Sequence, residues 1–267
     1  MQLDHHVVVV KYNQINFSAS STVTQSVVAN RSKKIGGTVA LLSLTFQDKT
    51  GSTRRDVTVT HAVIAGWTGR DRAAVEKHIV ELEELGIPRP KTIPIYFRMA
   101  ASRITTADTI EVLGAKSSGE VEFVLLQTGG RLWVGTGSDH TDREVETYGI
   151  TVSKHMCEHP IASTFWDYES VAPHWDKLIL RARIVEGGQS VLYQEGAVAA
   201  MLTPNEVISQ YAAGGGRLAE DSLMFCGTFA AHGGIRPSEK FEFELEDPVL
   251  KRKLQHSYRV VSLPING

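Results

Sequence analysis

Three acidic residues are spaced so that one β-hairpin can bring their side chains together. Glu120 and Glu122 precede a Gly-Gly dipeptide at residues 129–130, and Asp139 follows it. Two glycines between β-type runs are typical of a two-residue hairpin turn, which places Glu122 opposite Gly137 and Glu120 opposite Asp139. Because side chains alternate between the faces of a strand, the three carboxylates would share one face. Facing like charges destabilise a sheet, so the pattern predicts a hard cation held by carboxylate oxygens.

The other residues of this hairpin indicate what surrounds the carboxylates. The carboxylate face would also carry Val124, Leu126 and Trp133, and the opposite face, which has the composition of a core, would carry Val121, Phe123, Leu125, Leu132 and Val134. Gly135 and Gly137 would leave space above the backbone for an ion, water or substrate. A solvent-facing strand edge with ordinary acidic residues is the alternative, since charged residues are mostly exposed. A turn one residue longer would reverse the faces of one strand.

The elements that must position these residues are mainly β. Outside the hairpin, β-type runs occur at residues 5–13, 38–47, 54–67, 93–98, 108–113, 177–184, 190–196, 223–228, 239–245 and 256–264. Residues 70–85 have apolar side chains at helical spacing, and a capping box at residues 203–206 predicts a second helix that ends near Ala212. The section between the hairpin and Asp176 is expected to be polar and irregular. The fold class is therefore α+β and mainly β, with a β-rich segment at residues 1–61 and a second part at residues 62–267 within one structural unit.

Whole-chain properties limit the classes of function. The 267 residues include 28 basic and 30 acidic side chains, a balance that does not favour binding to nucleic acid or to a membrane surface. No apolar run reaches about 18 residues and the first residues lack a signal pattern, so neither a transmembrane helix nor secretion is expected. The two cysteines, Cys157 and Cys226, show no zinc or disulfide spacing. A cytoplasmic location is the resulting expectation.

Several common catalytic motifs are absent from the sequence. It has no Gly-rich loop for a dinucleotide or a nucleotide phosphate, no Gly-x-Ser-x-Gly nucleophile and no His-Glu-x-x-His zinc motif. His155 and His159 lie four residues apart, but no helical pattern surrounds them, so both are expected to be loop histidines. The carboxylate hairpin is therefore the main candidate site.

The order of polar motifs along the chain resembles the catalytic domain of the fumarylacetoacetase superfamily. That superfamily has an E-x-E motif, an N-D-x-S-A-R-D motif, a lysine, a hairpin that ends in glutamine, a helix and a G-T motif. The corresponding residues here are Glu120, Glu122, Asp139, Arg143, Lys154, Gln194, Gly227 and Thr228. The resemblance covers roughly residues 62–262 and is that of a divergent branch.

The resemblance implies a fold, a metal and a reaction. The fold would be a mixed β-sandwich roll with a few peripheral helices, and such proteins are generally homodimers. Glu120, Glu122 and Asp139 would hold one Mg²⁺, Mn²⁺ or Ca²⁺ ion, cations that suit oxygen-only ligands. The expected activity is metal-dependent hydrolysis of a C–C bond in a small 2-oxo acid or 1,3-diketone. Two alternatives stay open: a decarboxylase, hydratase or isomerase on a metal-bound 2-oxo acid, and a non-catalytic metal- or ligand-binding protein.

The resemblance also assigns roles to other side chains. Lys154 would be catalytic, because its ammonium group adds positive charge where the substrate becomes negative. The expected substrate-binding residues are Arg98, Arg143, Gln194 and Thr228. Arg143 is at the same time typical of a residue that pairs with a carboxylate and fixes a loop.

The water-activating segment of superfamily hydrolases and decarboxylases, G-x-N-Y-x-x-H-x-x-E, is altered in this chain. The corresponding stretch, residues 66–72, lacks the Asn and the Tyr, and Arg72 stands where the His would be. Glu76 and His78, on the predicted helix that follows, are the candidate replacements as catalytic residues. An amphipathic helix explains their presence equally well, so the alternative activities that need no such pair stay open.

Overall fold

The computed structural model describes residues 39–84, 89–212 and 216–266. By its internal contacts the chain divides into two units, Met1–Gly36 and Gly37–Gly267. The first unit lies outside the described residues, as does the β-type run at residues 5–13. The predicted division between residues 61 and 62 stays a prediction, although the described end of its first part contributes two strands to the large sheet of the second unit.

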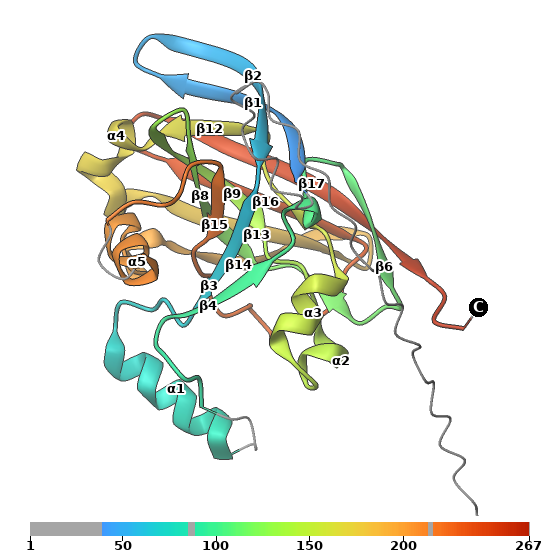
Figure 1. Cartoon of the computed structure of the whole chain (residues 1–267). Helices are drawn as coiled ribbons and strands as arrows, with labels where there is room; N and C mark the ends of the chain where they lie inside the picture. The colour runs from blue at the N-terminus through green and yellow to red at the C-terminus, as the bar shows by residue number, and fades with distance from the viewer. Residues whose placement is uncertain (1–38, 85–88, 213–215, 267) are drawn as a thin grey trace, which may run out of the picture. The chain divides into compact units, whose positions relative to one another are not determined.

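An eight-stranded sheet forms the larger layer of the second unit, with the strand order β2-β1-β12-β9-β8-β15-β3-β4. Its strands are β1 (Ala40–Asp48), β2 (Gly51–Val59), β3 (His61–Gly66), β4 (Ile95–Met99), β8 (Val121–Thr128), β9 (Arg131–Ser138), β12 (Thr164–Asp167) and β15 (Ser222–Phe225). The predicted hairpin, β8 and β9, therefore lies in the middle of the sheet, where β12 pairs with β9 and β15 pairs with β8 (Figure 1).

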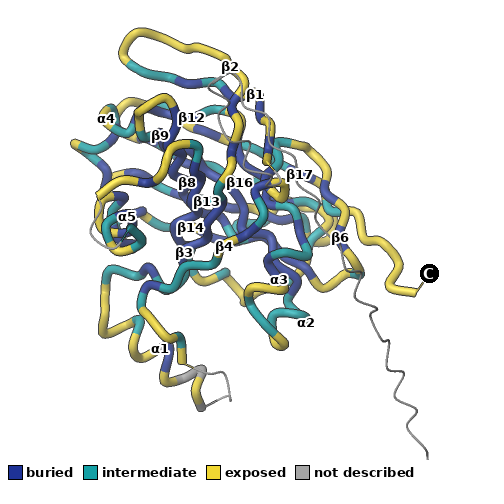
Figure 2. The backbone as a smooth tube through the Cα atoms, in the orientation of Figure 1, coloured by how far each residue is buried: buried dark blue, intermediate teal, exposed yellow. Residues whose placement is uncertain are grey.

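A five-stranded sheet packs against the large one, in the order β14-β13-β16-β17-β6. Its strands are β6 (Thr109–Leu113), β13 (Ile179–Glu186), β14 (Gln189–Ala197), β16 (Lys240–Asp247) and β17 (Arg252–Leu263), and two short pairs join β5 (Ile104–Thr105) to β11 (His159–Pro160) and β7 (Ser117–Ser118) to β10 (Thr141–Asp142). The core between the sheets includes Phe123 from β8, Leu180 from β13 and Phe241 from β16. Figure 2 shows that the buried backbone is concentrated in these strands.

Short helices lie around the strands. They are α1 (Arg72–Glu84), α2 (Arg143–Glu146), α3 (Ile150–Met156), α4 (Tyr168–Val171) and α5 (Pro204–Tyr211), with 3-10 turns at Ala101–Arg103, Ala172–Lys177 and Val198–Ala200. The capping box at Thr203 and Glu206 is present, and Asp71 accepts hydrogen bonds from the first backbone N–H groups of α1, so both predicted helices are confirmed. None of the helices in the described part of the chain is both long and apolar enough to cross a membrane.

The section after the hairpin is more regular than predicted. It contains α2, α3, α4 and the buried strand β12. Asp142 caps α2 by accepting hydrogen bonds from Glu144 and Val145, whereas α3 has no side-chain cap. Helices of four to seven residues are shorter than the window of about 11–18 residues in which helical periodicity is recognised, which is why the sequence pattern misses them.

The register of the hairpin is as predicted, but two expectations about its surroundings are wrong. Glu122 pairs with Gly137 across the strands. All of β8 is buried, because one face enters the core between the sheets and the other enters a second apolar cluster with Val124, Leu126 and Trp133, so the solvent-facing edge is excluded. The glycines leave no open space: a Cβ atom at Gly137 would lie 2.7 Å from the ring of Phe225, and one at Gly135 would collide with Phe165.

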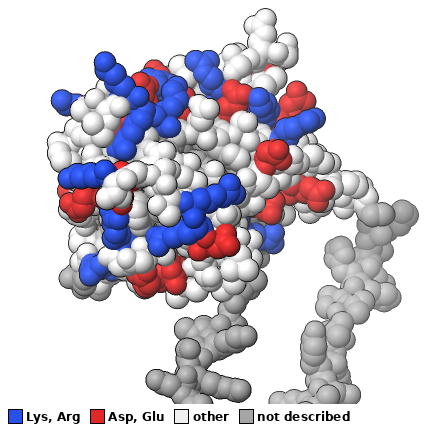
Figure 3. All heavy atoms as spheres, turned by 90° about the horizontal axis from the view of Figure 1, so that it is seen from above, with Lys and Arg blue, Asp and Glu red and all other residues white. Residues whose placement is uncertain are grey.

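Charged side chains are scattered over the face of the molecule that Figure 3 shows, between larger areas of uncharged residues. On the face seen in Figure 3, basic and acidic side chains are interspersed, without an extended area of one sign. This agrees with the near balance of 28 basic and 30 acidic residues in the chain.

Candidate functional site

The three predicted acidic residues meet at the open end of the β8–β9 hairpin. The backbone N–H of Asp139 donates to the carbonyl of Glu120 at 2.9 Å, which extends the strand pairing beyond the hairpin. Glu122 and Asp139 are 2% and 1% exposed, and the side chain of Glu120 is 16% exposed. The cluster is therefore buried, and Glu120 is its most accessible member. The predicted grouping of the three carboxylates is observed, on a face that packs into the protein.

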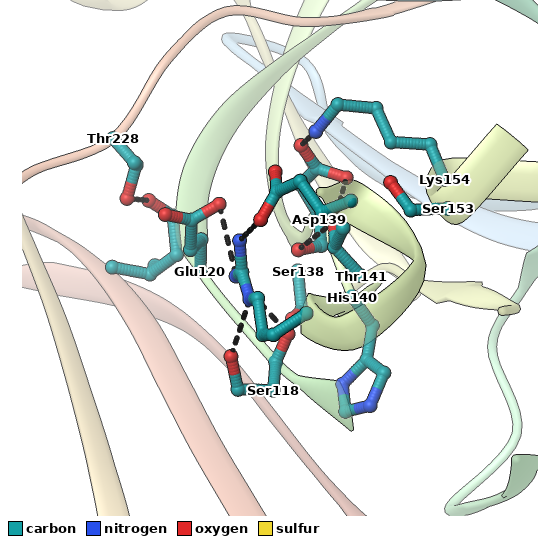
Figure 4. A network of polar contacts seen from close by, with 12 residues as sticks. Ser118, Glu120, Ser138, Asp139, His140, Thr141, Ser153, Lys154 and Thr228 are labelled. Atoms are coloured by element: carbon teal, nitrogen blue, oxygen red, sulfur yellow. Dashed lines mark hydrogen bonds and ion pairs between the residues drawn. The ribbon is translucent and has the colours of Figure 1, made fainter. Parts of the chain in front are cut away.

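Asp139 has two basic neighbours, one on each carboxylate oxygen. The ammonium group of Lys154, from α3, makes a short ion pair with Oδ2 (Figure 4). His159 Nδ1 lies 3.3 Å from Oδ1. Lys154 is itself buried, and its Nζ lies 5.9 Å from the centre of the Phe97 ring. The sequence predicts Lys154 at the site, and the structure brings it there.

Arg143 ties Glu120 to the loop that follows the hairpin. Its guanidinium lies 3.2 Å from Glu120 Oε2, donates to the Ser118 hydroxyl at 2.7 Å and donates to Glu146 at 3.0 Å. These contacts use the forked geometry with which arginine holds carboxylates. The structure therefore places Arg143 as the partner of a cluster carboxylate; its predicted contact with substrate stays a prediction.

Glu122 is held by the loop after β15. Its Oε2 accepts a hydrogen bond of 2.7 Å from the backbone N–H of Gly227. Gly227 has a φ of +105°, and a Cβ atom there would collide with the hydroxyl of Thr68. Only glycine fits this backbone without strain, and this fit lets the N–H group point at the carboxylate.

Gln194 and Thr228 connect the same loop to β8 and β14. Gln194 accepts from the backbone N–H of Val121 at 2.9 Å and donates to the Thr228 hydroxyl at 2.9 Å and to the carbonyl of Phe229 at 2.6 Å. Thr228 donates its hydroxyl proton to the carbonyl of Val121 at 2.7 Å. Both N–H donors of the Gln194 amide are thus used within the protein. Gln194 acts here as a link between elements, and Thr228 keeps one hydroxyl lone pair for a further contact.

Burial and mutual repulsion dominate the electrostatics of the cluster. Burial, followed by the charge of Asp139, raises the pKa of Glu122 well above its ordinary value of 4.5. Burial also raises the pKa of Glu120, although Arg143 and Lys154 oppose that shift. Burial alone would raise the pKa of Asp139, but Lys154 and His159 hold it well below its ordinary value. With all three carboxylates charged, the two cations Lys154 and Arg143 do not balance them, and Arg143 is also shared with Glu146.

These shifts predict how the metal-free protein responds to pH. Above 4.5, Glu120 and Glu122 keep protons in the folded state that the unfolded chain releases, so stability falls as the pH rises toward their raised pKa values. Asp139, whose pKa is lowered, contributes stability that is already complete in this range. His140, whose burial lowers its pKa to about 3, instead adds stability as the pH rises to the ordinary histidine value of 6.5. Thermal melts in EDTA should therefore show a melting temperature that declines as the pH rises above 6.5. Glu122→Gln, which cannot ionise, should flatten this decline, and an equal slope in that variant would contradict the assignment.

The donor chemistry of the cluster fits a divalent cation, although the side chains do not converge on one point as they stand. Among the described residues, no group of three or more His, Cys, Asp or Glu side chains is arranged to hold a metal ion. Each carboxylate instead has its own partner: Arg143, Gly227 or Lys154. Three buried carboxylates with an uncompensated negative charge are the oxygen donors that Mg²⁺, Mn²⁺ and Ca²⁺ take. The side chains would have to leave their present partners and rotate for common ligation.

The structure does not bring Glu76 or Arg98 to the cluster. Glu76, on α1, is exposed and makes a two-pronged ion pair with Arg89 at 2.8 and 3.0 Å. The side chain of His78 lies outside the described part of the structure. Arg98 is exposed and follows Phe97 in β4, so strand alternation directs it to the face opposite the ring near Lys154. Glu76 and Arg98 therefore have no place in the site as the structure shows it.

His159 is the neighbour of the cluster that sequence reasoning misses. The expectation of loop histidines is wrong, because His155 belongs to α3 and His159, fully buried, begins the short strand β11. The spacing of the two histidines carries no information, since a turn between α3 and β11 separates them. The only sequence signal is the placement of His159 five residues after Lys154.

The fold and the acid-rich hairpin define this chain as a protein of the fumarylacetoacetate hydrolase fold. A 5-carboxymethyl-2-hydroxymuconate delta-isomerase from Mycobacterium smegmatis has a TM-score of 0.56 at 14% identity, over 84% of this chain and 94% of that one. Yeast ynq8, a fumarylacetoacetate hydrolase family protein, has a TM-score of 0.53 at 19% identity, over 76% and 94%. A candidate fumarylpyruvate hydrolase from Burkholderia cenocepacia has a TM-score of 0.55 at 17% identity, over 90% and 100%.

The chain belongs to the family described as protein of unknown function DUF2848, whose model matches residues 65–258. No curated protein matches its sequence. The predicted fold class and the resemblance to the fumarylacetoacetase superfamily, as a divergent branch, are confirmed at the level of the fold.

Proposed function

We propose that this protein is a divalent-metal-dependent enzyme that hydrolyses a C–C bond in a small 2-oxo acid or 1,3-diketone. The observation that carries the proposal is the buried cluster of Glu120, Glu122 and Asp139 beside the ammonium group of Lys154. Burying several like charges together destabilises the folded state. Such groups are found more often at functional sites than elsewhere in proteins. The fold shared with proteins named as hydrolases and as an isomerase supports the same class of chemistry.

The residues of the cluster and its neighbours would have two roles: they would bind the substrate, and they would stabilise the charge that develops on it. When bound, a divalent cation would polarise a substrate carbonyl as a Lewis acid. Lys154 lies where its positive charge can stabilise negative charge that develops on a substrate oxygen. The free lone pair of the Thr228 hydroxyl can accept a hydrogen bond from a substrate hydroxyl, for example in the enol form of a diketone. Burial of the cluster excludes bulk water and strengthens each of these interactions.

A decarboxylase, hydratase or isomerase is the second candidate, because one observation weakens the hydrolytic step. Hydrolysis needs a group that activates water, and Glu76, the candidate for that role, is engaged by Arg89 at the surface. Arg72, which stands at the position of the superfamily's histidine, donates to the carbonyl of Ile93 at 3.3 Å. A decarboxylase or an isomerase acting on the same substrates adds no water in its bond-breaking step, so the argument favours these two activities over a hydratase.

Product analysis tests these proposals directly. Acylpyruvates and oxaloacetate should be incubated with the full chain and Mg²⁺ or Mn²⁺, with and without EDTA. We expect turnover that EDTA abolishes and added metal restores, with two acids from an acylpyruvate if hydrolysis is correct. Metal-dependent release of CO₂ from oxaloacetate or rearrangement without cleavage would favour the second candidate. Binding of metal without turnover of any substrate would contradict both and would support a non-catalytic protein.

A further inference from the structure

A cavity of about 290 Å³ lies at the turn end of the β8–β9 hairpin, away from the acidic cluster. Gln127 and Leu132, which pair across β8 and β9, line it together with Tyr168 and Ile208. Gln127 follows Glu122 by five residues in β8 and lies on the opposite face of the strand, so the two side chains are about 17 Å apart along β8. The volume is close to the lower end of the range for small-molecule sites, about 300–1,000 Å³.

The wall of this cavity contains a buried amide group without a hydrogen-bond partner. Gln127 is 5% exposed, and its side chain forms no hydrogen bond in the described part of the chain. Among the buried Ser, Thr, Gln, Asp, Glu, Lys and His side chains of the described residues, only Ser222, its cross-strand neighbour in β15, shares this property. Buried polar groups nearly always have a partner, so an unpartnered amide at the wall of a cavity indicates a place for a ligand.

Two exposed side chains that line the cavity carry charges that no other described residue neutralises. The Arg217 guanidinium donates only to the backbone carbonyl of Gly130, at 3.0 Å, and Glu169 has no ion-pair partner among the described residues. Arg131 and Asp167, which also line the cavity, are paired with each other at 2.6 Å. The cavity therefore offers a ligand one available cation and one available anion.

The chemistry of these groups specifies the class of ligand. The Gln127 amide has an acceptor oxygen and two N–H donors, and a second amide satisfies both kinds of group at once. A carboxylate matches the forked donors of a guanidinium, and an ammonium group matches a carboxylate. Leu132 and Ile208 add apolar surface for methylene groups. One small molecule that combines these features is an α-amino acid with an amide at the end of its side chain.

We propose that this cavity is a second binding site, which takes a free α-amino acid with a side-chain amide. The ligand's carboxylate binds Arg217, its ammonium group binds Glu169, and its amide forms hydrogen bonds with Gln127. The site lies on the opposite face of β8 from Glu122, so the inference goes beyond the proposed enzymatic activity and does not depend on it.

Calorimetric titration of the full chain with L-glutamine tests this proposal. We expect saturable binding with a Kd below about 1 mM. Three analogues each lack one group: L-methionine lacks the amide, glutaramate lacks the ammonium group and 4-aminobutanamide lacks the carboxylate. Each analogue should bind at least about tenfold more weakly than L-glutamine. The absence of saturable L-glutamine binding, or equally tight binding of any one analogue, would overturn the proposal.

Variants locate the binding in this cavity. Gln127→Met keeps the length of the side chain but removes its amide, so the affinity for L-glutamine should fall at least about tenfold. The melting temperature of the ligand-free variant should not fall, because the amide has no hydrogen bond to lose. Arg217→Gln, at an exposed position, should weaken binding by a similar factor and repeats the test if Gln127→Met does not fold. Gln189→Met, at an exposed position of β14, is the matched control and should bind like the wild type. Wild-type affinity in a folded Gln127→Met or Arg217→Gln variant would overturn the assignment.

Discussion

Replacing Lys154 with methionine is expected to lower activity by at least about 100-fold and to destabilise the protein strongly. The substitution keeps the length of the side chain but leaves Asp139, which is 1% exposed, without its ammonium partner. Breaking one partner of a buried ion pair costs about 3–5 kcal/mol, because the other charge stays buried. The loss of positive charge beside the substrate oxygen should lower kcat roughly 10²–10³-fold. Thermal melts and steady-state kinetics measure the two effects separately.

Two control variants separate the effect of Lys154 from a general loss of folding. The double variant Lys154→Met with Asp139→Asn removes both charges, so it should recover most of the lost stability while it stays inactive. Lys177→Met makes the same exchange at an exposed position and should leave both stability and rate near those of the wild type. A single Lys154→Met variant that is as stable as the wild type would contradict the buried pair. Full activity in that variant would contradict its catalytic role.

The sequence predicts the carboxylate hairpin correctly because the turn and the strand pattern that form it lie within one short stretch of the chain. A Gly-Gly turn determines which residues face each other, and strand alternation then determines which side chains share a face. The observed pairing of Glu122 with Gly137 follows from these two rules alone. The capped helix α5 is predictable for the same reason.

The environment of that hairpin could not be predicted in the same way. Whether a strand lies at an edge or in the middle of a sheet depends on β12 and β15, which are 26 or more residues from the end of β9 and only four residues long. The side chains that fill the space above Gly135 and Gly137 come from these strands. Packing from distant segments therefore decides whether the carboxylate face is exposed or buried. A local sequence pattern carries no information about that packing.

Some residues around the cluster could be predicted from the sequence, and others could not. The order of the motifs predicts Lys154 at the site, although α3 is too short to be recognised by its periodicity. The structure places Lys154 next to Asp139. The order of the motifs does not reveal His159, which meets Asp139 only because β11 pairs with β5, far upstream in the chain. It also does not reveal that Glu76 is paired with Arg89. Side-chain partners across long loops remain a matter of tertiary structure.

Glu122→Gln is expected to remove metal binding while it stabilises the metal-free protein. The amide oxygen can still accept the hydrogen bond from Gly227, which Glu122 Oε2 now receives at 2.7 Å, so the loop keeps its anchor. The substitution also removes a buried negative charge that burial and Asp139 both disfavour. At pH 8 in EDTA, the free energy of unfolding should therefore exceed that of the wild type. The rise in melting temperature that Mn²⁺ or Mg²⁺ causes in the wild type should disappear.

Comparison with two further variants makes this result specific. Glu122→Ala should lose metal binding as well, but it leaves the Gly227 N–H unpaired in a buried place and should be less stable than Glu122→Gln by about 1–3 kcal/mol. Glu144→Gln, at an exposed position of α2, should behave like the wild type in both respects. Unchanged metal affinity in Glu122→Gln would remove the ligand role of this carboxylate. Opposite signs for stability and affinity in that one variant would identify Glu122 as a group that destabilises the metal-free folded chain and binds a cation.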